Sequence, residues 1–234
     1  DPRGAVAFEI VPSEAARGEP IETLDGWTVR IEALHVQARS SARSVGSAGD
    51  REALWLPGYA GTIDGSGSLQ LVAPGIEAGP AEVRLATEAP PFPSVSVRAR
   101  AEKDGRAVVL DARFPAEAMH LASVDVSANA LTTVRAGLNA EALFGGFSHY
   151  EALCADGAVV NAPIRMSVAG PAFEDLAAAD EDGDGTLSPV ELEKKRPPTC
   201  ACCASETEWP EPLSTSILDV LSFRGGALFS NARD

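Results

Sequence analysis

Three aspartates, one glycine and one glutamate near the end of the chain have the types and the spacing of ligands for a hard cation. The stretch ADEDGDGTLSPVELEKK carries them, in the order Asp180, Asp182, Asp184, Gly185 and Glu191. Calcium takes six to eight oxygen ligands, and three alternating carboxylates can surround one side of the ion. A bidentate carboxylate from Glu191 can close the other side. This spacing predicts a site for one Ca²⁺.

Two further residues complete the expected ligand set. The sharp turn at Gly185 lets the backbone carbonyl of Thr186 reach the ion, and Ser188 can act through a water molecule. Ser188 also begins a Ser-x-x-Glu capping box with Pro189 at the first helical position, so we expect Glu191 to serve as a ligand and within the first helical turn. The predicted metal ligands are Asp180, Asp182, Asp184, Thr186, Ser188 and Glu191.

Residues 180–191 resemble the calcium loop of the EF-hand superfamily, close to the single or paired loops of bacterial exported proteins and of dockerins. The resemblance implies flanking helices over 171–179 and 189–196. It departs from the family in one respect, because sensor and buffer proteins pair two loops and no second loop closes in TIDGSGSLQL at 62–71. A lone loop cannot easily open a groove as calmodulin does, so we expect a structural brace.

Four cysteines indicate an oxidising compartment. Cys154 stands alone, whereas Cys200, Cys202 and Cys203 lie within TCACC. An even number of cysteines in an exported chain predicts two disulfides, and four cysteines leave three pairings open. Disulfide geometry favours one long-range bond from Cys154 into the cluster. A thiolate metal site that includes His149 is the alternative, but CACC lacks the spaced pairs of zinc sites.

Charge and composition exclude some functions. The net charge is −15, which disfavours nucleic acid, because a binding protein must neutralise phosphates with Lys and Arg. The chain is 45% hydrophobic and can bury a core, yet no run approaches the roughly 18 apolar residues of a membrane span. From the Asp1-Pro2 start we expect that an export signal or lipid-anchor segment was removed upstream. The predicted location is extracytoplasmic: periplasmic, on the outer-membrane surface or secreted.

The first three fifths of the chain alternate apolar and polar residues as half-buried strands do. In WTVRIEALHV, Trp27, Val29 and Ile31 share one face. Strand patterns recur over residues 5–11, 68–72, 81–86, 94–101, 106–114 and 132–138. Breaks rich in Gly or Pro separate them, and EKDGR predicts a hairpin that turns at Asp104-Gly105. The spacing predicts a mainly β fold, an antiparallel β-sandwich.

The character of the sequence changes towards the C-terminus. We expect a β-sandwich domain over 1–168 and a C-terminal helical segment over 169–234, packed on that domain and containing one EF-hand-like loop. PAFEDLAAAD has a proline suited to a first helical turn, and STSILDVLSF fits a second helix or a final strand. The small polar residues at 38–53 predict a long loop.

A second, weaker resemblance concerns histidines and tryptophans. IETLDGWTVRIEALHV at 21–36, followed much later by the Asp-rich loop, is similar to an arrangement in bacterial exported lipoproteins, some of them similar to four-cysteine periplasmic copper-binding proteins. That family implies a β-sandwich that holds copper through histidines and a modified tryptophan. No spacing identifies a site. The candidate residues are therefore all the histidines and tryptophans: His35, His120, His149, Trp27, Trp55 and Trp209.

Catalytic machinery is not visible in the sequence. GSGSL at 65–69 does not fit a nucleophile elbow, no glycine-rich phosphate loop occurs, and the histidines are scattered. We therefore predict no enzyme and no catalytic residues. The predicted function is that of an exported calcium-binding structural or interaction protein, in which calcium stabilises a segment that contacts another cell-envelope protein or a larger assembly. A periplasmic copper-binding protein is the alternative.

Overall fold

A computed structural model describes seven stretches of the chain. They are residues 2–23, 25–45, 55–65, 70–88, 92–144, 173–195 and 216–231. Strands dominate these stretches, so the prediction of a mainly β fold is confirmed. None of the helices in them has the length and apolarity that crossing a membrane requires.

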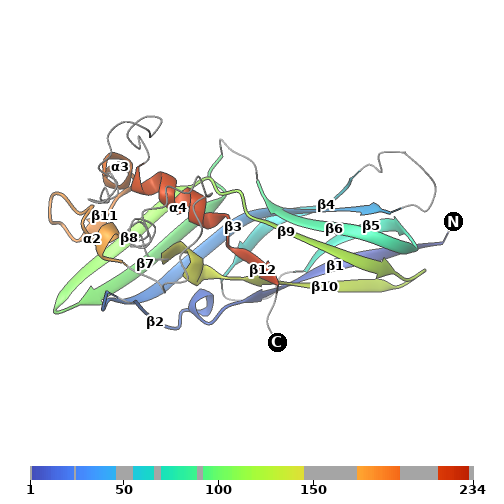
Figure 1. The fold of residues 1–234 in the computed structure, drawn as a ribbon, viewed down its shortest axis with the longest axis horizontal. Helices are drawn as coiled ribbons and strands as arrows, with labels where there is room; N and C mark the ends of the chain where they lie inside the picture. Colours follow the sequence, from blue (N-terminus) through green and yellow to red (C-terminus); the bar gives the residue numbers. More distant parts are fainter. Residues whose placement is uncertain are drawn as a thin grey trace, which may run out of the picture.

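The elements follow the chain order shown in Figure 1. The strands are β1 (Arg3–Pro12), β2 (Ile21–Glu22), β3 (Thr28–Ser44), β4 (Leu56–Asp64), β5 (Gln70–Glu77), β6 (Gly79–Thr87), β7 (Val95–Lys103), β8 (Arg106–Phe114), β9 (Met119–Val126), β10 (Leu131–Leu138), β11 (Thr186–Leu187) and β12 (Phe229–Asn231). The helices are η1 (Ala15–Arg17), η2 (Ala140–Phe144), α2 (Glu174–Ala177), α3 (Pro189–Lys194) and α4 (Ile217–Gly225).

The strands form two mixed sheets. The smaller sheet has the order β12-β10-β1-β5, and the larger has the order β11-β8-β7-β3-β6-β9, with β2 and β4 also paired to β3. Most pairs are antiparallel, but β1 runs parallel to β10 and β11 runs parallel to β8. The prediction of purely antiparallel sheets is therefore wrong for these two pairs. Each joins strands separated by many intervening elements, as a parallel pair requires.

The long strand β3 organises the larger sheet. It pairs with β7 over 28–36 and with β6 over 38–44, while β4 pairs with 35–42 from the opposite edge. The expected loop at 38–53 is therefore wrong for 38–44, and 46–54 lie outside the described residues. The buried positions in that part of β3 are all small residues, Ala38, Ser40, Ser41 and Ala42. Their size hid the alternating pattern.

The hairpin predicted from EKDGR is confirmed. Strands β7 and β8 pair in register from Val95↔Phe114 to Lys103↔Arg106. The turn residues Asp104 and Gly105 have φ angles of 50° and 80°. Two consecutive residues at positive φ match the right-handed twist of the flanking strands.

One buried cluster joins the two sheets and the helices after residue 173. It includes Phe8 from the smaller sheet, Leu85 and Phe114 from the larger sheet, and Phe173 and Leu187 from the C-terminal region, all at 0% exposure. Helix α4 begins within STSILDVLSF, which was one of the two predicted alternatives, and it ends at Gly225. Strand β12 follows that helix and was not predicted.

Buried hydroxyls replace backbone hydrogen bonds of the sheet at two connections, the one between β6 and β7 and the one between β8 and β9. Ser94 Oγ donates to the Ala116 carbonyl at 3.2 Å and accepts from the Ala116 amide at 2.9 Å. Thr87 Oγ1 donates to the same carbonyl and accepts from the Ala118 amide at 3.0 Å. Helix α4 packs on this point, because a Cβ added to Gly225 would collide with the Ala116 side chain. The hydroxyls thus interrupt the ladder without leaving buried backbone groups unpaired.

The substitution Thr87→Val tests this role. It keeps the side-chain shape but leaves the buried Ala118 amide without its acceptor, so we expect a loss of about 1–3 kcal/mol in the free energy of unfolding. Thr62→Val, on the exposed face of β4, is the matched control and should change it by less than about 0.5 kcal/mol. Urea denaturation measures both, and equal losses in the two variants would refute the role.

Candidate metal site

The three predicted aspartates converge. One carboxylate oxygen each from Asp180, Asp182 and Asp184 lies within 4.8 Å of the others. The backbone between them turns back on the side chains: the Asp184 amide donates to Asp182 Oδ1 at 3.1 Å, and the Thr186 amide donates to Asp184 Oδ1 at 2.6 Å. Gly185, with φ of 81°, supplies the left-handed turn. The loop therefore gathers negative charge around one point.

Asp180 is the member of this group that burial affects most. Its side chain is only 5% exposed, and its Oδ1 atom has no hydrogen-bond partner among the described residues. Its Oδ2 atom lies 3.7 Å from the Arg106 guanidinium, which is itself half-exposed. A buried carboxylate oxygen without a partner is costly, and a bound cation would satisfy it.

Glu191 occupies a different place from the three aspartates. The predicted capping box is confirmed: Glu191 Oε2 accepts from the Ser188 amide at 2.9 Å and from Ser188 Oγ at 2.7 Å, and the Glu191 amide donates to Ser188 Oγ. These bonds from Ser188 lower the pKa of Glu191. Its Oε1 atom accepts from the Glu181 amide at 3.3 Å. Glu191 is outside the converging group, so its role as a ligand stays a prediction, as do those of Thr186 and Ser188.

A short parallel strand attaches the loop to the larger sheet. In β11, Thr186 lies opposite Val109 and Leu187 lies opposite Leu110 of β8. The Val109 amide donates to the carbonyl of Gly185 at 2.8 Å. Both leucines have 0% exposure. The sheet edge thus fixes the loop immediately after the last of the three aspartates.

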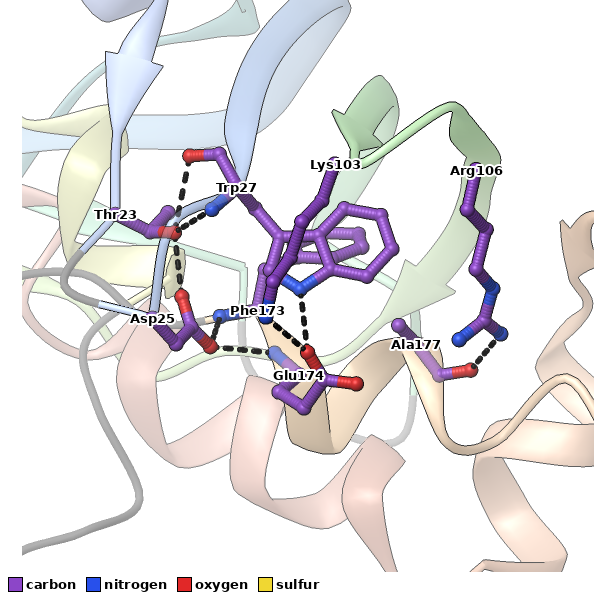
Figure 2. A network of polar contacts seen from close by, with 8 residues as sticks. All are labelled: Thr23, Asp25, Trp27, Lys103, Arg106, Phe173, Glu174 and Ala177. Carbon is purple, nitrogen blue, oxygen red and sulfur yellow. Dashed lines mark hydrogen bonds and ion pairs between the residues drawn. The ribbon is translucent and has the colours of Figure 1, made fainter.

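The helix before the loop is held at its first residues by Asp25 (Figure 2). Asp25 Oδ2 accepts from the amides of Phe173 at 2.7 Å and Glu174 at 2.6 Å, and Oδ1 accepts from the Thr23 hydroxyl. Burial alone would raise the pKa of Asp25, but the bonds from Thr23, Glu174 and Phe173 outweigh it and the net pKa is lowered. Asp25 therefore caps α2 from a distant part of the chain.

Trp27 lies beneath the same helix. Its ring is 1% exposed and packs on Phe173 with the centroids 5.4 Å apart. Its indole Nε1 donates to Glu174 Oε2 at 2.9 Å, and Lys103 donates to the same oxygen at 2.8 Å (Figure 2). The bonds from Lys103 and then Trp27 lower the pKa of Glu174. The indole nitrogen, the one polar atom of the Trp27 side chain, is thus hydrogen-bonded to Glu174 of α2.

Arg106 holds the other end of α2. Its guanidinium donates to the Ala177 carbonyl at 2.9 Å and lies 5.7 Å from the centre of the Trp27 ring (Figure 2). The same side chain is the neighbour of Asp180 in the loop. The β7–β8 hairpin therefore positions both α2 and the first aspartate. We call the contacts of Asp25, Trp27 and Arg106 with this helix the α2 clamp. Sequence reasoning missed it because its partners are far apart in the chain: 71 residues separate Arg106 from Ala177, and no local pattern encodes the contact.

The residues suggested by the copper resemblance do not gather in the described stretches. His35 is exposed on β3, and His120 is buried on β9, where burial lowers its pKa. Trp27 belongs to the α2 clamp, whereas Trp55 lies near two arginines. Among the residues that the structure describes, no histidine belongs to a group of three or more closely spaced ligands. Other predicted residues lie outside the described stretches: His149, Trp209, Cys154, Cys200, Cys202 and Cys203.

Comparisons with protein-family models, characterised proteins and solved structures find no significant match to this chain. The functional argument therefore depends on the geometry of the loop and its attachments.

The substitution Asp25→Ala tests the clamp. Loss of a helix cap predicts a decrease of about 1–2 kcal/mol in the free energy of unfolding at pH 7. Because folding lowers the pKa of Asp25, its charge contributes stability above the pKa of the unfolded chain and loses it as the pH falls through the lowered value. The difference between wild type and variant should therefore shrink below about pH 4.

Urea denaturation from pH 7 to pH 2.5 measures this difference. Asp125→Ala, at an exposed position on β9, is the control and should be near neutral throughout. A deficit in Asp25→Ala that stays constant down to pH 2.5 would show that the carboxylate charge does not hold the helix.

Proposed function

We propose that the chain is an exported calcium-binding structural or interaction protein, in which one Ca²⁺ stiffens a contact-bearing segment, residues 173–195. The observation that carries this proposal is the buried Asp180 carboxylate, which has one oxygen without a partner and lies beside Asp182 and Asp184. A cation there would relieve both the unsatisfied oxygen and the repulsion among three carboxylates.

The donor atoms favour calcium over other metals. The converging atoms are all carboxylate oxygens, which suit hard cations, whereas zinc and copper sites use imidazole and thiolate ligands. Magnesium demands near-ideal octahedral geometry at shorter distances and usually retains several waters. An irregular loop, with Thr186 and Glu191 as further predicted ligands, suits the larger and more adaptable calcium ion. Ca²⁺ would supply charge neutralisation and a fixed meeting point for these oxygens.

The attachments of the loop support a bracing role for calcium. In paired EF-hands the central strand of one loop pairs with that of the other, whereas here Leu187 lies opposite Leu110 of the sheet edge. Asp25 and Arg106 hold the helix before the loop. After the loop, the Lys195 carbonyl accepts from the Ile217 amide at 2.9 Å, which links α3 to α4. An ion bound between these attachments would tie the helices on both sides of the loop, α2 and α3, to the larger sheet.

The remaining features of the proposal follow from the sequence. The finer architecture is a two-layer β-sandwich over 1–168 with an EF-hand-like segment over 169–234 packed on it. The proposed location is extracytoplasmic, with two disulfides among the four cysteines. Extracellular calcium modules bind at about 0.1–1 mM, and the loop is expected in this range. The proposed partner is another protein of the cell envelope.

Calcium binding is tested by a matched pair of loop variants. Glu181 and Asp182 are adjacent and exposed, but only Asp182 belongs to the converging group. At one hundred times its dissociation constant, calcium should stabilise the wild type by about 2.7 kcal/mol, equivalent to a rise of about 5–10 °C in Tm over protein in EDTA. Asp182→Asn should lose most of this rise, whereas Glu181→Gln, with the same change of charge, should keep it.

Differential scanning calorimetry measures the shift, and titration calorimetry gives the stoichiometry. Equal Tm values for the wild type in calcium and in EDTA would overturn the proposal. Equal losses in the two variants would assign the effect to overall charge and contradict a specific site.

A further inference from the structure

The outward face of the larger sheet has two halves with different surface chemistry. Where β3 pairs with β7, most of the exposed charges form ion pairs, and Arg30 instead donates to the Gly18 carbonyl at 2.9 Å. Arg98 lies 3.0 Å from Glu32 and 3.6 Å from Asp111, and Arg100 lies 2.7 Å from Glu102. Such balanced, exposed pairs are typical of a solvated surface.

The other half, where β3 pairs with β4 and β6 and β6 pairs with β9, combines arginines with apolar side chains. The strand register sets three rows across β3, β6 and β9: Arg39, Ala86 and Met119; Ser41, Arg84 and Leu121; Arg43, Glu82 and Ser123. We call these nine residues, with Trp55, the arginine face. Residues of opposite parity, including Leu85 and His120, are buried, so the rows point away from the core.

Large apolar side chains of the arginine face are exposed to an unusual degree. Met119 is 57% exposed and Leu121 is 52% exposed. They are two residues apart on β9 and therefore lie side by side on one face. Adjacent exposed apolar side chains beside polar groups mark interaction sites on soluble proteins.

Trp55 orders two of the arginines. The guanidinium carbons of Arg43 and Arg84 lie 4.9 and 4.6 Å from the centre of its ring, and cation–π contacts of this kind hold a guanidinium in place. Arg84 Nε donates to Ser41 Oγ at 3.1 Å, and Arg43 forms an ion pair with Glu82. A held guanidinium loses less conformational entropy when it binds a carboxylate.

Charge on the arginine face is opposite in sign to that of the chain. Its rows contain Arg39, Arg43 and Arg84 but one acid, Glu82, in a protein of net charge −15. Arg39 is exposed and has no ion-pair partner within the described part of the chain. Because charges further away than about 8 Å are largely screened at physiological ionic strength, this local excess governs short-range contact.

We propose that the arginine face binds an acidic segment of a partner protein. Carboxylates of that segment pair with Arg39 and Arg84, and an apolar side chain packs on Met119 and Leu121. Alternation of cationic and apolar groups fits a peptide, because an anionic glycan has no apolar side chains to cover the two exposed residues. This surface lies on β6 and β9, away from the end of the molecule that carries α2, β11 and α3 (Figure 1). The inference therefore does not depend on calcium binding.

A peptide-display selection on the full chain tests this inference, with a random peptide library as the probe. The selected peptides should carry two or more acidic residues around an apolar or aromatic one. The double variant Arg84→Gln/Leu121→Ser should bind them at least tenfold more weakly. The matched control Arg100→Gln/Leu131→Ser, which changes an arginine of β7 and the 54% exposed Leu131 of β10, should bind as the wild type does.

Three results would overturn the inference. The first is that the selected peptides lack acidic residues. The second is that the double variant and its control bind the peptides equally well. The third is that the double variant binds more weakly only when its thermal melting is also lowered, and binds as the control does when both melt as the wild type does. Two further assays address other occupants: sedimentation that shows a dimer abolished by Arg84→Gln/Leu121→Ser, or binding to vesicles of anionic lipid abolished by it, would assign the face to those partners instead. Repeating the selection in EDTA separates this test from calcium binding, because peptide affinity should persist.

Discussion

The Asp180 carboxylate is buried at the junction between helix α2 and the acidic loop, and burying a charge without full compensation costs free energy. The surrounding contacts hold it there nonetheless. Arg106 lies near one oxygen and bonds the last turn of α2, Asp25 caps the first turn, and β11 continues the loop onto β8. Hydrophobic burial of Phe173 and neighbouring side chains supplies the stabilisation that offsets this cost. The proposed cation would pair with the oxygen of Asp180 that these contacts leave without a partner.

We propose that calcium in this arrangement acts as a brace, because the loop has attachments on both sides. A sensor needs two states of a mobile helix pair, whereas α2 here is fixed at both ends by residues of the β-sheet region. The pairing of β11 with β8 also covers part of an edge strand, whose unpaired backbone groups are otherwise open to association. The arginine face lies on different strands, so the proposed stiffening at one end and the proposed recognition on the other half of the sheet would be physically separate.

Local patterns in the sequence predicted local structure. The turn at Asp104-Gly105, the Ser188–Glu191 capping box and the convergence of three aspartates follow from residue spacing within a few positions. Contacts between distant segments had no such signal. Trp27 was predicted on a strand face and Asp25 was given no role, and their bonds to α2 span about 150 residues. Residues 38–44 of β3 are mostly small and polar, so their composition resembled that of a loop and these seven strand residues were not predicted.

The most direct test of the account is hydrogen exchange at the Val109 amide, which donates to the Gly185 carbonyl between the sheet edge and the acidic loop. Exchange by nuclear magnetic resonance would be compared in saturating calcium and in EDTA, with the amides of β1 as an internal reference. The account predicts that calcium slows exchange at Val109 by tenfold or more, and by a larger factor than in β1. Equal exchange rates at Val109 under the two conditions would contradict the claim that calcium fixes the loop to the sheet.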